Sequence, residues 1–229
     1  MADDDGAAGA SSSVTGGACG YFTNVGLFGG PPTVRGAGQS IPPASAASAS
    51  PEVTLPPGGS STPVSATDGN GAMAMYGPAV IFAGRPPKDP NLPIPPSGAI
   101  TVTTKGKKAV TSTATVKNVG PGPFTATSVR STCHAATAGV TGSTTITKGV
   151  LATATDADGN VTASEALPTH PPVDHTLTGT TGSGDTFRAV FNEQVVDADG
   201  AITVNAVHLY LLGPTAVGDV VIARSQAGA

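Results

Sequence analysis

The stretch FRAVFNEQVVDADGAITVNAVHLYLL, residues 187–212, carries the strongest secondary-structure signal in the chain. In its first half, Phe187, Ala189 and Phe191 alternate with other residues, as in a half-buried strand. The turn-forming sequence Asp197-Ala-Asp-Gly200 follows. The pattern predicts one long β-hairpin with a return strand that places every second residue on one face: Ile202, Val204, Ala206, His208, Tyr210 and Leu212. We expect His208 to pack beside Tyr210 and to bond a backbone carbonyl.

The composition extends this prediction to the rest of the chain. Among the 229 residues are 31 Gly and 21 Pro, whereas aromatic residues make up only 4% and charged residues 11%. Gly and Pro disfavour long helices, and the abundant Thr and Val fit a pleated surface. From Gly98 onward, short strand-like segments recur between turn signals. These features predict an all-β fold, specifically an antiparallel β-sandwich of jelly-roll or immunoglobulin-like type with long Pro- and Gly-rich loops.

The chain reads as one domain, residues 18–224, because β-sandwiches of this length often form a single unit. Residues 1–17 consist mainly of Ala, Gly, Ser and Asp, which predicts a disordered tail. Residues 225–229 are expected to be a frayed C-terminal tail. The Pro-rich segments 42–63 and 85–96 are expected to be long surface loops.

Charge and hydropathy exclude several classes of partner. The formal net charge is −4, and only Lys105, Lys107 and Lys108 form a basic group, so neither nucleic acid nor an anionic membrane is an expected partner. No apolar run is long enough to span a membrane. The start Met1-Ala-Asp-Asp-Asp-Gly6 resembles a new start placed before a mature sequence, which predicts an exported protein whose signal has been removed.

Two cysteines, Cys19 and Cys133, each lie beside a strand-like segment. A disulfide between them would close a long loop and contribute about 3–5 kcal/mol in the chain-entropy picture. We expect this bridge, with two free buried thiols as the alternative.

The two Asp-Ala-Asp-Gly turns raise the question of a calcium site. Asp156 and Asp158 place two carboxylates ahead of a glycine, and hard cations prefer such clustered oxygens. Aligned with a calcium loop, Glu165 would take the last position, but Ala154 would take the first without supplying an oxygen. Asp-Gly after a strand is itself a hairpin signal. We therefore prefer a turn, with calcium as the alternative.

The segment His170–His175 contains two imidazoles and the carboxylate of Asp174 in a Pro-rich loop. These side chains are suitable ligands for zinc or copper. A catalytic zinc needs a third protein ligand, and neither His134 nor His208 can be placed beside them from the sequence. We prefer solvated loop histidines and predict no cofactor.

Catalytic motifs are not found. No Gly-x-Ser-x-Gly element occurs. Cys133 and His134 are adjacent, so on a strand their side chains would point to opposite faces and could not form a thiolate–imidazole pair.

The order of four segments resembles actinobacterial exported proteins called choice-of-anchor P family proteins. The likeness covers about the last two-thirds of the chain. The segments are NVGPGPFTATSVRSTC (118–133), GVTGSTTI (139–146), FRAVFNEQV (187–195) and ITVNAVHLYLLGPTAVGDVVIA (202–223). The resemblance implies a secreted or wall-associated β-rich protein without an assigned activity, and it supplies no catalytic residue.

These observations predict a secreted or cell-surface, non-enzymatic structural or adhesive module. Its expected partner is extracellular material such as carbohydrate, facing the Thr-rich strands that contain Thr101, Thr103, Thr111, Thr113 and Thr115. One alternative is a self-assembling subunit of a fibre, capsid or surface layer. The other is a metal-dependent extracellular hydrolase that uses the loop His and Asp residues.

Overall fold

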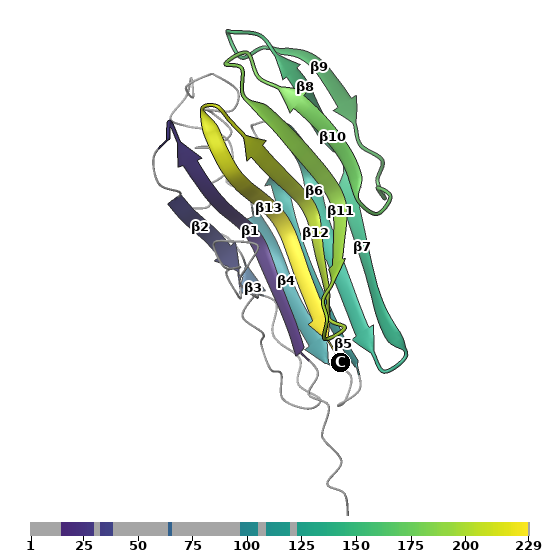
Figure 1. Cartoon of the computed structure of the whole chain (residues 1–229). Coiled ribbons are helices and arrows are strands. Elements are labelled where there is room, and N and C mark those ends of the chain that lie inside the picture. Colours follow the sequence, from purple (N-terminus) through teal and green to yellow (C-terminus); the bar gives the residue numbers. More distant parts are fainter. Residues whose placement is uncertain are drawn as a thin grey trace, which may run out of the picture.

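A computed structural model describes residues 15–29, 33–38, 64–65, 97–104, 109–119 and 123–228. These residues form thirteen strands and no helix, which confirms the all-β prediction (Figure 1). None of them belongs to a helix that could span a membrane. The expectations for residues 1–14, for the Pro-rich segments 42–63 and 85–96, and for Lys105, Lys107 and Lys108 concern positions outside the described residues.

The recurring short strands expected from Gly98 onward are present. The bounds of the thirteen strands are β1 (Thr15–Leu27), β2 (Thr33–Gly38), β3 (Val64–Ser65), β4 (Ser97–Thr104), β5 (Ala109–Val119), β6 (Phe124–Ala136), β7 (Gly139–Thr147), β8 (Val150–Thr155), β9 (Val161–Ala166), β10 (His175–Thr180), β11 (Thr186–Val196), β12 (Ile202–Leu212) and β13 (Ala216–Gly228).

The described strands belong to one continuous sheet, in the order β2-β1-β13-β12-β11-β10-β8-β6-β5-β4-β3. β7 also pairs with β6, and β9 also pairs with β8. The sheet is a nearly closed mixed barrel rather than the antiparallel sandwich that we predicted. The reason is β8, which pairs antiparallel with β6 and parallel with β10 through Ala154 and Thr180, and so joins what would otherwise be two separate sheets.

The two halves of the curled sheet pack face to face along an elongated body (Figure 1). β13 contacts β5 and β6, while β12 contacts β6 and β7. The core between them contains few rings and many small aliphatic residues, so each residue buries a modest apolar area. Its largest fully buried side chains are Phe187, Phe191, Ile146, Leu151, Ile222, Val110, Val129, Val204 and Val207.

The predicted hairpin is confirmed as β11 and β12, with Phe187 opposite Leu211 and Val196 opposite Ile202. The predicted single face of the return strand is wrong. Ile202, Val204 and Ala206 point into the core, but from Val207 onward the odd-numbered residues do so. His208, Tyr210 and Leu212 therefore lie on the outward face.

This reversal occurs at one level in three neighbouring strands. In β11 the odd-numbered residues point into the core up to Phe191. In β13 the inward residues are even-numbered up to Ile222 and odd-numbered from Ala223 onward. Asn192 and Ala223, which flank Ala206 in the register, have left-handed φ angles of 54° and 53°. A residue outside the β conformation breaks the period-two alternation of a strand. The reversal thus changes which side chains share the outer face.

Strand pairing extends past both ends of the expected 18–224 domain. β1 begins at Thr15, within the segment expected to be a tail, and β13 continues to Gly228 instead of fraying after Arg224. The reason is their pairing: β1 and β13 run antiparallel from Thr15–Gly228 to Leu27–Ala216, which satisfies backbone groups of both strands over this length.

Candidate functional site

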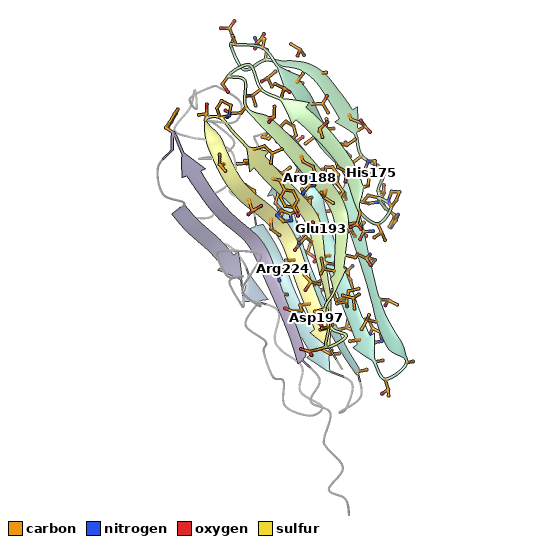
Figure 2. All side chains as sticks on the ribbon, in the orientation of Figure 1. His175, Arg188, Glu193, Asp197 and Arg224 are labelled. Atoms are coloured by element: carbon orange, nitrogen blue, oxygen red, sulfur yellow. The ribbon has the colours of Figure 1, made fainter. Side chains whose placement is uncertain are left out.

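A compact group of polar side chains lies on the outward face of β11, β12 and β13 (Figure 2). We call Glu193, Asn205, His208, Tyr210 and Asp219 the outer cluster. Asn205 and His208 are three residues apart, and on a regular strand they would point to opposite faces. The reversal after Ala206 turns both outward, so that Glu193 on the neighbouring strand can reach both.

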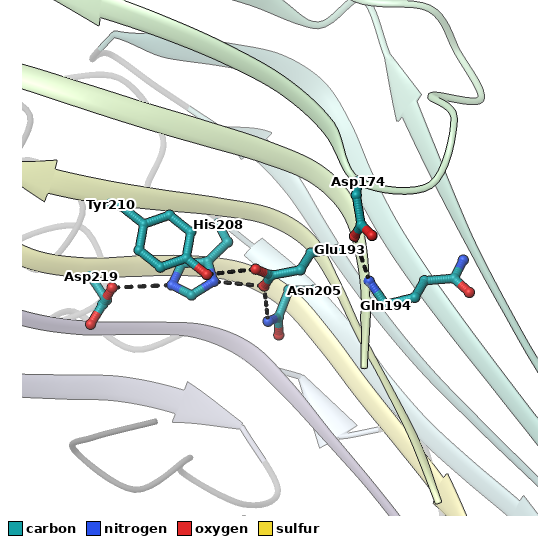
Figure 3. Close-up of polar contacts among 7 residues, drawn as sticks. All are labelled: Asp174, Glu193, Gln194, Asn205, His208, Tyr210 and Asp219. Atoms are coloured by element: carbon teal, nitrogen blue, oxygen red, sulfur yellow. Dashed lines mark hydrogen bonds and ion pairs between the residues drawn. The ribbon is translucent and has the colours of Figure 1, made fainter. Parts of the chain in front are cut away.

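Glu193 is the centre of the outer cluster (Figure 3). Its Oε2 accepts hydrogen bonds from Asn205 Nδ2 and His208 Nδ1, each at 2.7 Å. Its Oε1 accepts the hydroxyl of Tyr210 at 2.5 Å. Three donors therefore surround one half-buried carboxylate, which is the arrangement that stabilises a carboxylate in its charged form.

His208 bridges two carboxylates. Its Nδ1 faces Glu193, and its Nε2 lies 3.2 Å from Asp219 Oδ1. Because ionised carboxylates only accept hydrogen bonds, both ring nitrogens must donate, which is the hydrogen-bonding state of an imidazolium. The ring also stacks on Tyr210 with centroids 3.8 Å apart, as we predicted, but it bonds carboxylates rather than the backbone carbonyl that we expected.

The charges in the outer cluster shift three acid–base equilibria. Burial alone would raise the pKa of Glu193, but the hydrogen bonds and charge of His208, with Tyr210 and Asn205, lower it to about 2. Burial would lower the pKa of His208, yet Asp219 and Glu193 raise it above its ordinary value. Burial and the neighbouring Glu193 raise the pKa of Tyr210, so its phenol remains protonated.

This geometry is better suited to linking the strands through side-chain hydrogen bonds than to catalysis. A histidine whose two nitrogens both donate to carboxylates presents no lone pair to a substrate. Arg188 covers the Tyr210 ring, with its guanidinium carbon 4.2 Å from the ring centroid. The outer cluster therefore ties β11, β12 and β13 together at the level where their pairing is irregular.

The two Asp-Ala-Asp-Gly sequences form turns, as we preferred. Oδ1 of Asp156 accepts the backbone N–H groups of Asp158 and Asn160, and Oδ2 accepts the side-chain amide of Asn160. These bonds, led by that of the Asn160 side chain, lower the pKa of Asp156. Asp197 binds Asp199 N and Ala201 N in the same way. The carboxylate oxygens of the first Asp in each turn thus close the turn.

The residues of the His170–His175 segment are used separately. His170 is exposed. Asp174 binds the edge of β11 next to the first β10 pair, His175–Phe191: it donates its N–H to Asn192 O and accepts the N–H of Gln194 on Oδ1. The His175 ring packs against the Phe191 ring, with the two ring centroids 6.0 Å apart. Within the described part of the chain, no group of three His, Cys, Asp or Glu side chains is placed to hold a metal ion.

The predicted disulfide is not formed, because Cys133 is a free, buried thiol. Cys133 lies on the inward face of β6, where its Sγ donates to Ser225 O at 3.1 Å and accepts the Ser225 hydroxyl at 3.1 Å. The hydrogen-bonding partner of this thiol is therefore Ser225 on β13. The side chain of Cys19 lies outside the described residues.

We expect Cys133 to resist thiol reagents in the folded protein. Burial raises its pKa to about 12, so almost no thiolate exists at neutral pH. In a Cys19→Ser variant, a chromogenic disulfide reagent should label less than about one-tenth of the chains before unfolding and all of them in denaturant. A Cys19→Ser/Cys133→Ala variant gives the background signal. Rapid complete labelling of the native protein would contradict the burial of this thiol.

A second candidate surface is the outward face of β5, β6 and β7, which carries Ser and Thr in register. We call this face the hydroxyl wall. Its rows run across the three strands as Thr111–His134–Thr141, Thr113–Thr132–Ser143, Thr115–Arg130–Thr145 and Lys117–Ser128–Thr147. Neighbouring strands lie about 4.8 Å apart and alternate residues about 6.8 Å apart along each strand, so the hydroxyls form a regular lattice.

Hydrogen bonds between strands fix several of these hydroxyls. Thr111 Oγ1 lies 2.9 Å from His134 Nδ1, and Ser128 donates to Thr147 Oγ1 at 3.1 Å. In the second row, the hydroxyls of Thr113 and Thr132 are 3.4 Å apart. Because each hydroxyl both donates and accepts, the wall keeps capacity for further hydrogen bonds. The Thr positions on β5 that the sequence suggested as a polar face belong to this wall, whereas the side chains of Thr101 and Thr103 are outside the described residues.

Asp185 is a buried carboxylate that the sequence reasoning missed. Its Oδ1 accepts the backbone N–H groups of Thr215 and Ala216, the latter at 3.2 Å, and its Oδ2 accepts the Ser183 hydroxyl at 3.0 Å. The segment before β11 is thereby fastened to the turn between β12 and β13. The main partners of Asp185 lie about thirty residues away along the chain, so local sequence could not identify them. The one local signal is the Gly-Ser-Gly sequence before Asp185, which indicates a turn.

Comparisons of this chain with protein-family models, with curated proteins and with solved structures each found no match. The evidence on function is therefore the geometry of the outer cluster and of the hydroxyl wall.

Proposed function

We propose that this protein is a secreted or cell-surface, non-enzymatic adhesive module that holds polysaccharide against the hydroxyl wall. The observation that carries the proposal is the in-register array of hydroxyl side chains on β5, β6 and β7. Sugars present closely spaced hydroxyls, and a lattice of groups that both donate and accept can match them without a fixed pocket.

The chemistry of the wall sets the expected mode of binding. Its outward residues are hydroxyls with a few cations rather than aromatic rings, so each sugar contact is weak. Retention then depends on many rows acting at once on a long or insoluble polymer, where linked contacts raise the effective affinity. Short oligosaccharides are expected to bind poorly.

The outer cluster supports a scaffold role. Its ionisable groups are used in fastening three strands, so this part of the chain maintains the sheet and leaves the opposite face for contact. The proposed location outside the cell follows from the resemblance of about the last two-thirds of the chain to choice-of-anchor P family proteins.

The experiment is a sedimentation assay with insoluble cellulose, chitin and purified peptidoglycan. We expect the wild-type protein to be retained by at least one polymer and a Thr113→Val/Thr132→Val/Ser143→Ala variant, which removes one row of hydroxyls, to be retained about 5-fold less, in line with the loss of several weak hydrogen bonds. A Thr178→Val/Thr180→Val variant is the matched control, because it removes exposed hydroxyls from β10. Retention by none of the polymers, or equal loss in both variants, would contradict the proposal.

A further inference from the structure

β9 differs from the other strands in its exposure. All six of its residues, Val161–Ala166, are exposed, on both faces of the strand. Within the described part of the chain, β9 pairs with β8 alone, so its second edge has no partner there. Exposed edges of this kind are templates for pairing with another strand unless charge, proline or a covering segment blocks them.

The orientation of the backbone shows which groups face this edge. The register of β8 and β9 is regular over Ser164–Ala166 and shifts beyond it. Leu167 donates its N–H to Gly149 O at 2.9 Å, so residue 167 and the alternate residue Glu165 turn their polar backbone groups towards β8. In an antiparallel ladder the residues between them point the other way. The N–H and C=O groups of Ser164 and Ala166 therefore face outward.

We propose that β9 pairs antiparallel with β9 of a second copy of this chain, about a two-fold axis at Ser164. Ser164 then lies opposite its own counterpart, and the two exchange both backbone hydrogen bonds. The one charged residue of the strand, Glu165, lies opposite Ala163, so no like charges face each other directly.

The segments next to β9 are also complementary in this arrangement. The Asp156–Asn160 turn of one copy, with its two carboxylates, extends towards the exposed His170 that follows β9 in the second copy. The two β9 strands alone bury far less than the roughly 1,600 Å² of a standard interface, so the association is weak and concentration-dependent. This inference is independent of polysaccharide binding, because β9 lies outside the hydroxyl wall.

The test is sedimentation equilibrium of the full chain over a wide range of concentration. The wild-type mass should rise towards twice that of one chain, and Ser164→Ala should behave the same because it keeps the outward N–H. Ser164→Pro should stay at the mass of one chain, since it removes that N–H without removing a bond to β8. The far-UV spectrum of each variant reports whether it is folded. A wild-type protein that keeps the mass of one chain throughout overturns the proposal, as does a folded Ser164→Pro variant that associates like Ser164→Ala.

Cross-linking tests the register itself. Residues in a hydrogen-bonded antiparallel pair have Cα atoms about 5.5 Å apart, which a disulfide can span. In a Cys19→Ser background, Ser164→Cys should form covalent dimers on oxidation, whereas Ala163→Cys, whose counterpart lies diagonally, should form at least about 5-fold fewer. Equal cross-linking at both positions overturns the pairing centred on Ser164.

Discussion

Replacing Asp185 by alanine is expected to lower the free energy of unfolding by about 3–5 kcal/mol, because the backbone N–H groups of Thr215 and Ala216 lose the buried carboxylate that accepts from both. Asp185 is fully buried, and its carboxylate accepts the N–H groups of Thr215 and Ala216. The same substitution also releases the Ser183 hydroxyl.

The measurement is urea unfolding of Asp185→Ala and Asp185→Asn beside the wild-type protein. Asparagine keeps one acceptor oxygen of the same shape, so its loss should be smaller, about 1–2 kcal/mol. Asp199→Ala is the control: its side chain is exposed, and the change should stay within about 0.5 kcal/mol. If Asp185→Ala unfolded at the same urea concentration as the control, the carboxylate would not be a structural element of the turn.

The secondary structure was largely predictable from the sequence because it depends on local patterns. The alternation around Phe187 and Phe191 and the Asp-Gly at residue 199 were sufficient to predict β11, β12 and the turn between them. The closure of the sheet was not predictable. It depends on β8 pairing with β6 and, in parallel, with β10, and nothing in the local sequence of β8 indicates either partner.

The outer cluster was hidden from sequence reasoning by the reversal of strand phase. Strict alternation placed His208 on the same face as Ile202 and Val204, inside the core. Its true position depends on left-handed backbone at Asn192 and Ala223, and alanine is not a residue whose type signals such a conformation. Glu193 and Asp219 are therefore partners of His208 that only the folded sheet identifies.

Two of the Asp residues that the sequence offered as alternative metal ligands have hydrogen-bonding roles in the fold. Asp156 and Asp174 were selected because acidic and imidazole groups lie near them along the chain. In the fold Asp156 accepts the backbone N–H groups of Asp158 and Asn160 in its own turn, whereas Asp174 accepts that of Gln194 on β11. The carboxylate of Asp156 follows the common behaviour of Asp in a turn, where the side chain accepts backbone N–H groups of the same turn.

The second large effect concerns pH. The pKa of Glu193 is lowered from 4.5 to about 2, so its contribution to stability is fully present above pH 4.5 and is lost as pH falls towards 2. The pKa of His208 is raised from 6.5, so its contribution is fully present below pH 6.5 and is lost as pH rises through the higher folded value. The outer cluster therefore stabilises the fold most between pH 4.5 and 6.5.

Glu193→Gln should remove most of this dependence. The variant keeps the size of the side chain but leaves His208 with Asp219 as its remaining carboxylate in the cluster, so we expect a loss of about 2 kcal/mol in the pH window where both groups contribute. The loss should shrink at alkaline pH, where the wild-type imidazole is neutral. Urea unfolding across the pH range measures both effects, with Glu165→Gln as the matched control because its carboxylate is exposed on β9. If the pH profile of Glu193→Gln ran parallel to that of the control, the imidazolium bridge between β11 and β13 would not exist in solution.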